Sequence, residues 1–214
     1  MASQSESPVP TYAFVFDGTR CTGCKTCALA CKDARNLDET VSYRQVYEYE
    51  GGGWAQDETG AWTTDGFTYY VSLACNHCAE PACTQVCPTG AMHRNELGFV
   101  TVDDRRCVGC GYCALACPYH APKVDRAAGH SVKCDGCTER VAAGLEPVCV
   151  EACPQRALAF GELVELAQEW GDGEEFAPLP PFSCTRPMLI ARAPRGARPC
   201  DNREGRVVNV SELV

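Results

Sequence analysis

Short runs of apolar residues, some of them alternating with polar ones, predict strands that precede or follow cysteine-rich loops. Residues Tyr12–Asp17 predict one strand and residues 99–103 predict another, and each leads into such a loop. Two further segments, 89–92 and 155–160, follow other cysteine-rich loops and match each other in position. Strand, loop and short helix therefore recur, and this repetition predicts two similar units within one chain.

The segment from residue 32 to residue 74 interrupts the repeat and has a β pattern of its own. Residues 41–47 and Phe67–Leu73 predict strands, with turns at residues 51–53 and at Gly60. The aromatic residues of the segment are Tyr43, Tyr47, Tyr49, Trp54, Trp62, Phe67, Tyr69 and Tyr70. They form either a small local core or a docking surface, since aromatic residues are common in both.

The C-terminal region predicts one helix and then an irregular segment. Residues 162–170 predict a short helix with Leu163 and Leu166 on one face, and Gly171 follows as its stop. Prolines at positions 178, 180 and 181 then break regular structure. We predict that residues 178–214 form an extended tail bound along a partner, with a disordered tail as the alternative.

The composition excludes several classes of partner. Residues 1–11 are polar, predict a flexible tail and lack the basic and apolar regions of a secretory signal. No apolar run approaches the roughly 18–20 residues of a membrane-spanning helix. The formal net charge of −9 argues against nucleic acid, which needs a basic surface. We therefore expect no signal of its own, no direct membrane span and no nucleic-acid partner.

Cysteine dominates the candidate chemistry, because all but two of the 18 cysteines form four groups of four. The first and third groups follow the C-x2-C-x2-C-x3-C pattern of bacterial-type ferredoxins, and the other two lengthen the middle gap. The groups are Cys21, Cys24, Cys27 and Cys31; Cys75, Cys78, Cys83 and Cys87; Cys107, Cys110, Cys113 and Cys117; and Cys134, Cys137, Cys149 and Cys153. These thiolates match the ligands of four [4Fe–4S] clusters, so the sequence predicts an electron-transfer protein.

Other uses of cysteine fit this pattern less well. Structural zinc sites usually combine two widely separated C-x2-C pairs, and a disulfide framework needs an oxidising compartment. Neither explains four groups in the same register. Cys184 and Cys200 match no ligand spacing and are predicted to be ordinary thiols. His77 and His120, which stand beside ligands, are predicted to pack or to adjust the local charge.

Basic residues and glycines near the ligand loops have predicted supporting roles. The basic residues are Lys25, Lys32, Lys123, Lys133 and Arg140. They either offset cluster charge and adjust its potential, or are ordinary solvated charges. The glycines Gly23, Gly109, Gly111 and Gly136 predict tight turns of backbone around a bulky cofactor.

The spacing of the groups leaves their pairing open. In two-cluster ferredoxins the last cysteine of each run ligates the other cluster, so the groups must pair. The second and third groups are close enough to form a compact unit, which the first and fourth would then enclose. Pairing first with second and third with fourth is equally compatible with the spacing.

Four stretches of sequence resemble the iron–sulfur subunit of dimethyl sulfoxide reductase. They are RCTGCKTC at 20–27, CNHC at 75–78, CPY at 117–119 and KCDGC at 133–137. The similarity runs from about residue 12 to residue 189 and includes residues 46–49 and Gly161. The order of the four groups is also similar to that of the wider set of electron-transfer subunits that serve molybdopterin oxidoreductases.

The resemblance implies an α+β fold of two ferredoxin-like 2[4Fe–4S] units, one inserted in the other, with a β-rich insertion and an extended C-terminal tail. The four-cluster domain would span 12–177, with the insertion at 32–74 and the inner two-cluster unit at 75–117. The implied ligand sets are Cys21, Cys24 and Cys27 with Cys153; Cys134, Cys137 and Cys149 with Cys31; Cys75, Cys78 and Cys83 with Cys117; and Cys107, Cys110 and Cys113 with Cys87. Some relatives with a three-iron cluster lack the cysteine that stands here as Cys110, so four cubanes are expected.

The resemblance also implies the partners. Members of this family have no active site of their own and relay electrons from menaquinol, through an integral membrane anchor that oxidises the quinol, to a large molybdopterin catalytic subunit. The cluster on Cys21 would face the catalytic subunit and the one on Cys107 the anchor. The protein would be peripheral on the cytoplasmic membrane, co-exported with its partner if it acts outside. The alternative function is a free-standing polyferredoxin electron carrier.

Overall fold

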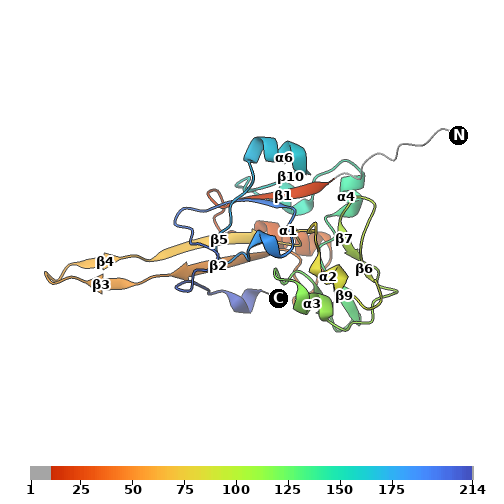
Figure 1. Ribbon diagram of the computed structural model, residues 1–214, viewed down its shortest axis with the longest axis horizontal. Helices are drawn as coiled ribbons and strands as arrows, with labels where there is room; N and C mark the ends of the chain where they lie inside the picture. The colour runs from red at the N-terminus through yellow and green to blue at the C-terminus, as the bar shows by residue number, and fades with distance from the viewer. Residues whose placement is uncertain (1–10, 214) are drawn as a thin grey trace.

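Two three-stranded sheets form the centre of the molecule in the computed structural model, which describes residues 11–213. The first sheet has the order β10-β1-β11, with β1 (Tyr12–Asp17) antiparallel to β10 (Leu158–Glu162) and parallel to β11 (Leu189–Arg192). Strand β1 confirms the first predicted strand (Figure 1). Of the flexible tail predicted over residues 1–11, all but Thr11 lies outside the described residues.

The second sheet has the order β12-β2-β5 and shares a core with the first. Its strands are β2 (Gln45–Gly51), β5 (Phe67–Leu73) and β12 (Arg206–Val207). Strand β5 has the predicted bounds, whereas β2 begins four residues later than the predicted strand 41–47. The common core contains Phe14, Phe16, Tyr49, Tyr69, Val71, Leu158 and Leu189, together with Cys27, Cys78, Cys149 and Cys153. Ligand cysteines are thus embedded in the hydrophobic core.

The predicted helix after the last ligand loop is confirmed as α6 (Leu163–Trp170). Its buried Leu166 packs with Ala13, Val15 and Ile190 on the first sheet. Gly171 follows the helix with φ +78°, a backbone conformation that favours glycine and therefore suits a helix stop.

The C-terminal segment is not the extended arm that we predicted. Strand β11 lies beside β1, and residues 189–191 are buried in that sheet. Farther along, β12 pairs with β2, and Asn209 donates through Nδ2 to the carbonyl oxygen of Val46 at 2.8 Å. In the sequence, the surrounding prolines and arginines obscure the short apolar run at 188–191, which joins the first sheet. The predicted boundary at residue 177 is therefore not a boundary of the fold.

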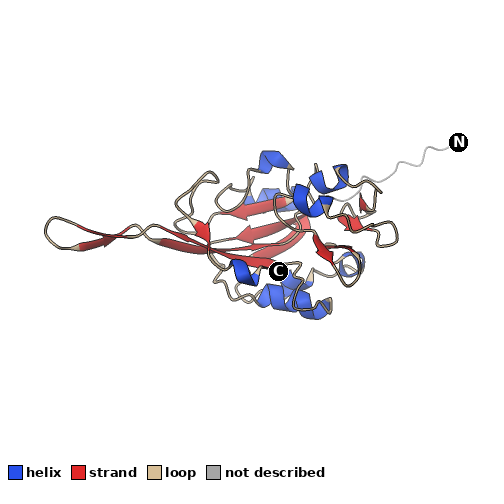
Figure 2. Cartoon of the chain, turned by 90° about the horizontal axis from the view of Figure 1, so that it is seen from below, coloured by secondary structure: helices blue, strands red, loops and turns tan. Residues whose placement is uncertain are grey.

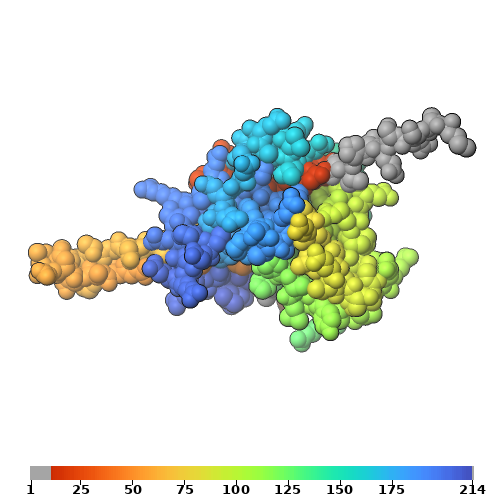
Figure 3. Space-filling model, in the orientation of Figure 1, coloured from red at the N-terminus to blue at the C-terminus, as the bar shows by residue number. Residues whose placement is uncertain are grey.

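The aromatic residues of the inserted segment divide between two environments. Strands β3 (Trp54–Gln56) and β4 (Trp62–Thr64) extend the β2–β5 pair into a hairpin that projects from the body (Figures 1 and 3). Trp54 and Trp62 are 70% and 63% exposed there. Tyr49 and Tyr69 are buried in the common core instead. The base of the segment therefore contributes to a core, whereas its tip is an exposed surface.

Short elements complete the fold and carry the ligand loops. The helices are α1 (Thr26–Ala34), α2 (Ala82–Gln85), α3 (Tyr112–Ala116), α4 (Thr138–Ala142) and α5 (Val148–Glu151), with 3-10 turns at Phe182–Cys184 and Val210–Glu212. The strands are β6 (Met92–Arg94), β7 (Val100–Val102), β8 (Lys123–Asp125) and β9 (His130–Val132), paired β6–β7 and β8–β9. Helices lie on both sides of the central strands (Figure 2). Within residues 11–213, no helix has both the length and the apolar character needed to cross a membrane.

Candidate iron–sulfur sites

The ligand loops contain the tight, left-handed turns that their glycines predict. Gly23, Gly109, Gly111 and Gly136 have φ values of +68°, +65°, +78° and +72°. At Gly136 a side chain is also excluded by space, because an added Cβ atom would lie 2.7 Å from the ring of Phe99. Glycine is therefore required at this position both for its backbone conformation and for the close approach of the aromatic ring.

Four cysteines from the second and third groups line one small, largely apolar cavity. They are Cys87, Cys107, Cys110 and Cys113, which we call the Cys107 set. Cys107 also accepts a hydrogen bond from the Ser131 amide at 3.3 Å. The cavity thus has the donor chemistry of an iron–sulfur site, with the last cysteine of one run joining three cysteines of the other.

The remaining four cysteines of these two groups line a second small cavity. They are Cys75, Cys78, Cys83 and Cys117, which we call the Cys75 set. Helix α2, which carries Cys83, packs against α3, which carries Cys113. The second and third groups are therefore brought together, and each cavity draws its cysteines from both.

The first and fourth groups are brought together in the same crossed manner. The sulfurs that influence the pKa of Cys21 are those of Cys27, Cys153 and Cys24, and we call these four cysteines the Cys21 set. Cys31, at the other end of its run, has Cys149 and Cys137 as thiolate neighbours. Together with Cys134, itself a neighbour of Cys31 and Cys149, they form the Cys134 set. Helix α1, which bears Cys27 and Cys31, packs against α5, which bears Cys149.

Backbone amides donate hydrogen bonds to sulfur in each set, and two hydroxyl groups lie within hydrogen-bond distance of a sulfur atom. The amides of His77, Met92, Gly136 and Ala157 donate to Cys75, Cys87, Cys134 and Cys153 at 3.5, 3.4, 3.4 and 3.3 Å. The hydroxyl oxygens of Ser72 and Ser131 lie 3.3 Å from the sulfur atoms of Cys27 and Cys113. Such donors stabilise thiolate charge and raise the potential of a bound iron–sulfur centre.

Burial works against the thiolate form at several of these sulfurs. It raises the pKa of Cys21 to about 11 and that of Cys31 to about 12. Burial likewise raises the pKa of Cys83 to about 12. Since a metal centre takes the thiolate, bound iron would supply the positive charge that these buried sulfurs otherwise lack. Within residues 11–213, no three Cys, His, Asp or Glu side chains converge on a point that suits a single metal ion.

The predicted basic residues differ in their surroundings. Lys25 forms an exposed ion pair with Glu212, and Arg140 forms one with Glu151. Lys32 is bound to the carbonyl oxygen of Asp38 at 2.7 Å. These are surface interactions, and they fit the ordinary alternative for those residues.

Lys133 is different, because its side chain is buried beside the ligands. Its Nζ atom donates to the carbonyl oxygens of Val100 and Cys134, and its charge lowers the pKa of Cys83 and of Cys134. Burial nevertheless dominates at both thiols and the net shift of each pKa is upward. Lys123 is partly buried, and burial lowers its pKa.

Arg44 is a buried cation that the sequence analysis missed. It lies in the inserted segment, away from every ligand run, and is only 3% exposed. The guanidinium lies 5.5 Å from the centroid of the Phe14 ring and donates to Ser72 Oγ at 3.1 Å. No spacing rule connects position 44 to a cysteine, so its proximity to the ligands emerges only once the sheets have formed.

His77 and His120 also have different roles. His77 is buried, accepts a hydrogen bond from the Val100 amide through Nδ1 at 3.0 Å, and has Nε2 3.9 Å from the sulfur of Cys134. Burial holds the pKa of His77 well below its usual range, so the ring is neutral. His120 is exposed in a left-handed turn. Of the two predicted ordinary thiols, Cys184 is exposed and Cys200 half-buried.

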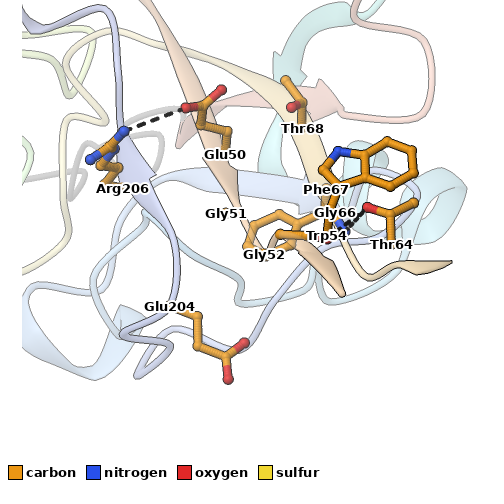
Figure 4. A pocket seen from close by; sticks show the side chains of 11 residues that line it. Glu50, Gly51, Gly52, Trp54, Thr64, Gly66, Phe67, Thr68, Glu204 and Arg206 are labelled. Carbon is orange, nitrogen blue, oxygen red and sulfur yellow. Dashed lines mark hydrogen bonds and ion pairs between the residues drawn. The ribbon is translucent and has the colours of Figure 1, made fainter. Parts of the chain in front are cut away.

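A separate groove lies at the base of the hairpin (Figure 4). Trp54 and Phe67 line it, and Arg206 forms an ion pair with Glu50 there at 3.9 Å. The groove contains none of the ligand cysteines, and we assign no chemistry to it.

Comparison with known proteins places these sites in context. Residues 66–163 match a family described as "4Fe-4S dicluster domain". The protein is 51% identical to the B subunit of the anaerobic dimethyl sulfoxide reductase of Haemophilus influenzae, over 94% of its own length and 98% of that protein's. It is 50% identical to the corresponding Escherichia coli subunit, with the same coverage. It is also 39% identical to a thiosulfate reductase electron transfer subunit of Salmonella typhi, over 74% of its own length and 80% of that protein's.

Proposed function

Since this protein belongs to the family of anaerobic dimethyl sulfoxide reductase B subunits, we propose that it relays electrons from a quinol-oxidising membrane anchor to a molybdopterin catalytic subunit. It is an iron–sulfur electron-transfer subunit, and four [4Fe–4S] clusters are its cofactors. The observation that supports this function best is the crossed grouping of ligand cysteines around two small cavities.

Each of the four sets would hold one cluster, which supplies a one-electron redox centre when bound. The Cys107 set and the Cys75 set would form an inner two-cluster unit over 75–117. The Cys21 set and the Cys134 set would form the outer unit that encloses it. The apolar cavity walls exclude water, and the amides that donate to sulfur fix the sulfur atoms and balance part of their charge. No residue of this protein needs to bind a substrate or move a proton in such a relay.

The contacts between sets suggest their order. Cys27 of the Cys21 set neighbours Cys149 of the Cys134 set, and Cys134 neighbours Cys75 of the next set. The packing of α2 on α3 joins the Cys75 set to the Cys107 set. We infer that electrons from a quinol pass through the four sets in the order Cys107, Cys75, Cys134 and Cys21.

The first and last sets in this order each have one exposed cysteine, which is Cys110 in the Cys107 set and Cys24 in the Cys21 set. Electrons must enter and leave where a redox centre approaches the surface. We propose that the Cys107 set faces the membrane anchor and the Cys21 set faces the catalytic subunit. The protein would then be a peripheral, non-catalytic subunit on the cytoplasmic membrane, with the exposed hairpin and C-terminal segment available to its partners.

The test is anaerobic co-expression of the protein with a candidate catalytic subunit and anchor, followed by iron analysis and EPR titration with dithionite. We expect about sixteen irons per chain, signals from interacting reduced cubanes, and co-purification of all three subunits. Zinc without paramagnetism would refute the iron–sulfur sites. Four clusters in a protein that binds neither partner would favour a free polyferredoxin carrier instead.

A further inference from the structure

Arg44 lies between two of the ligand sets that the proposed function assigns to separate clusters. The three groups whose charge raises its pKa most are the sulfur atoms of Cys149, Cys27 and Cys134, which a bound cluster would hold as thiolates. Burial lowers the pKa of the guanidinium and is the largest effect, yet together the sulfur atoms outweigh it and the net shift is upward. Cys27 belongs to the Cys21 set, whereas Cys149 and Cys134 belong to the Cys134 set. The cation therefore faces both.

The surroundings of Arg44 also link it to both sets. Its Nη1 atom donates to Ser72 Oγ at 3.1 Å and to the Ser72 carbonyl oxygen at 3.3 Å. The same hydroxyl lies 3.3 Å from the sulfur of Cys27. On the other side, the sulfur of Cys149 lies close enough to the guanidinium to raise its pKa. Arg44 thus approaches one set through Ser72 and the other directly.

A purely structural role leaves two features of Arg44 unexplained. A buried guanidinium normally pairs with a carboxylate that shares its desolvation cost, whereas the strongest anionic neighbours here are sulfurs. In addition, Nε is buried and has no hydrogen-bond partner within residues 11–213. Orphaned buried donors are costly and call for an explanation. A bound, negatively charged cluster at each set would balance the cation.

We propose that Arg44 raises the reduction potentials of the clusters in the Cys21 and Cys134 sets, and so keeps both reducible within the relay. This inference rests on the proposed function. Reduction adds one electron, received from the neighbouring centre and later passed to the next, and neither forms nor breaks a bond. Each added electron makes a cluster more negative, and a fixed positive charge in a poorly polarisable interior stabilises the reduced form more than the oxidised form. Arginine suits this task because it stays protonated at any working pH.

The test is an EPR-monitored redox titration of the assembled complex with Arg44→Met and Arg44→Lys. We expect Arg44→Met to decrease the equilibrium constant for reduction at least tenfold at two of the four centres, which is 59 mV for a one-electron couple. Arg44→Lys keeps the charge and should leave both constants within about threefold of the wild type. The signal that Cys110→Ser alters belongs to the Cys107 set and should not shift in either variant.

Arg198→Met is the matched control, because Arg198 also lies over an aromatic ring, 4.3 Å from the Phe67 centroid, but near the hairpin base. It should shift none of the four potentials. Unchanged potentials in Arg44→Met, or an equal shift of all four, would overturn the inference. If Arg44→Met does not assemble, Arg44→Lys decides alone, and a tenfold decrease at either centre would exclude the charge as the cause.

The same titration separates this inference from the proposed function. A wild-type protein without four cubanes refutes the function itself. A wild-type protein with four cubanes and an Arg44→Met variant with unaltered potentials refutes only the role of Arg44.

Discussion

Replacing Gly136 by alanine should damage the ligand loop that carries Cys134 and Cys137. The residue has φ +72°, and the new Cβ atom would lie 2.7 Å from the Phe99 ring. That ring is almost fully buried and packs 4.9 Å from His77 between ring centroids, so it has little room to move. The substitution therefore adds both backbone strain and a steric clash to one ligand loop.

The two costs can be separated with a second glycine. Gly144 has φ +75°, and an added Cβ atom would meet nothing within 4 Å. Gly144→Ala should therefore cost only the left-handed backbone penalty, about 1–2 kcal/mol. Gly136→Ala should cost that amount plus the overpacking of a rigid core, about 1–3 kcal/mol more. The expected total for Gly136→Ala is thus about 2–5 kcal/mol.

The assay is iron retained per chain during a urea titration, followed by bleaching of cluster absorbance under anaerobic conditions. Gly136→Ala should lose iron at a clearly lower urea concentration than Gly144→Ala, and the loss should begin with one cluster rather than all four. If the two variants have the same midpoint, the packing of Phe99 against the loop does not limit cluster retention, and the steric argument is wrong.

Further predictions concern the other sets and the scaffold. Cys110→Ser should convert or abolish one cluster and block electron uptake; unchanged quinol-linked turnover with four clusters in the EPR spectrum would contradict both the ligand assignment and the relay order. Trp54→Ala should change the free energy of unfolding by no more than about 0.5 kcal/mol, because the side chain is 70% exposed, and a larger loss in a urea titration would mean that the hairpin is buried in the isolated protein. Leu166→Ala should destabilise the packing of α6 on the first sheet by about 2–5 kcal/mol, and a wild-type urea midpoint would refute that role. Removing iron with a chelator under oxidising conditions should lower the melting temperature, because the buried sulfurs then lose the positively charged iron that they bind as thiolates. An unchanged melting temperature would show that the protein folds independently of its clusters.

The cysteine loops and several strands could be predicted from the sequence because their signals are local. The left-handed turn at Gly136 follows from the ligand spacing, and strand β5 follows from its own alternation. The predicted strand 41–47 begins four residues before β2 because Val41 and Ser42 continue the alternation of apolar and polar residues without joining the ladder, which begins at Gln45 opposite Leu73.

Features that depend on distant partners could not be predicted in this way. The spacing of the groups allowed two pairings, and only the packing of α1 on α5 and of α2 on α3 brings particular runs together. Strand β11 is four residues long and has no alternation of apolar and polar residues, so it can be recognised as a strand only from its pairing in the first sheet. From the sequence alone, Arg44 cannot be distinguished from a surface arginine, because it approaches the ligand loops only once β2 and β5 have paired.

The parallel pairing of β11 with β1 has a consequence for biosynthesis. Phe14 lies opposite Leu189, so β1 is synthesised long before the strand that completes its sheet. Asp17, at the end of β1 and four residues before Cys21, likewise receives its ion pair with Arg192, at 3.5 Å, only once β11 is present. Contacts of such long sequence separation form slowly, because closing the intervening loop costs entropy before the contact can stabilise the fold. We therefore expect the Cys21 set to be loaded only after β11 has been synthesised, while the contiguous 75–117 region can organise earlier.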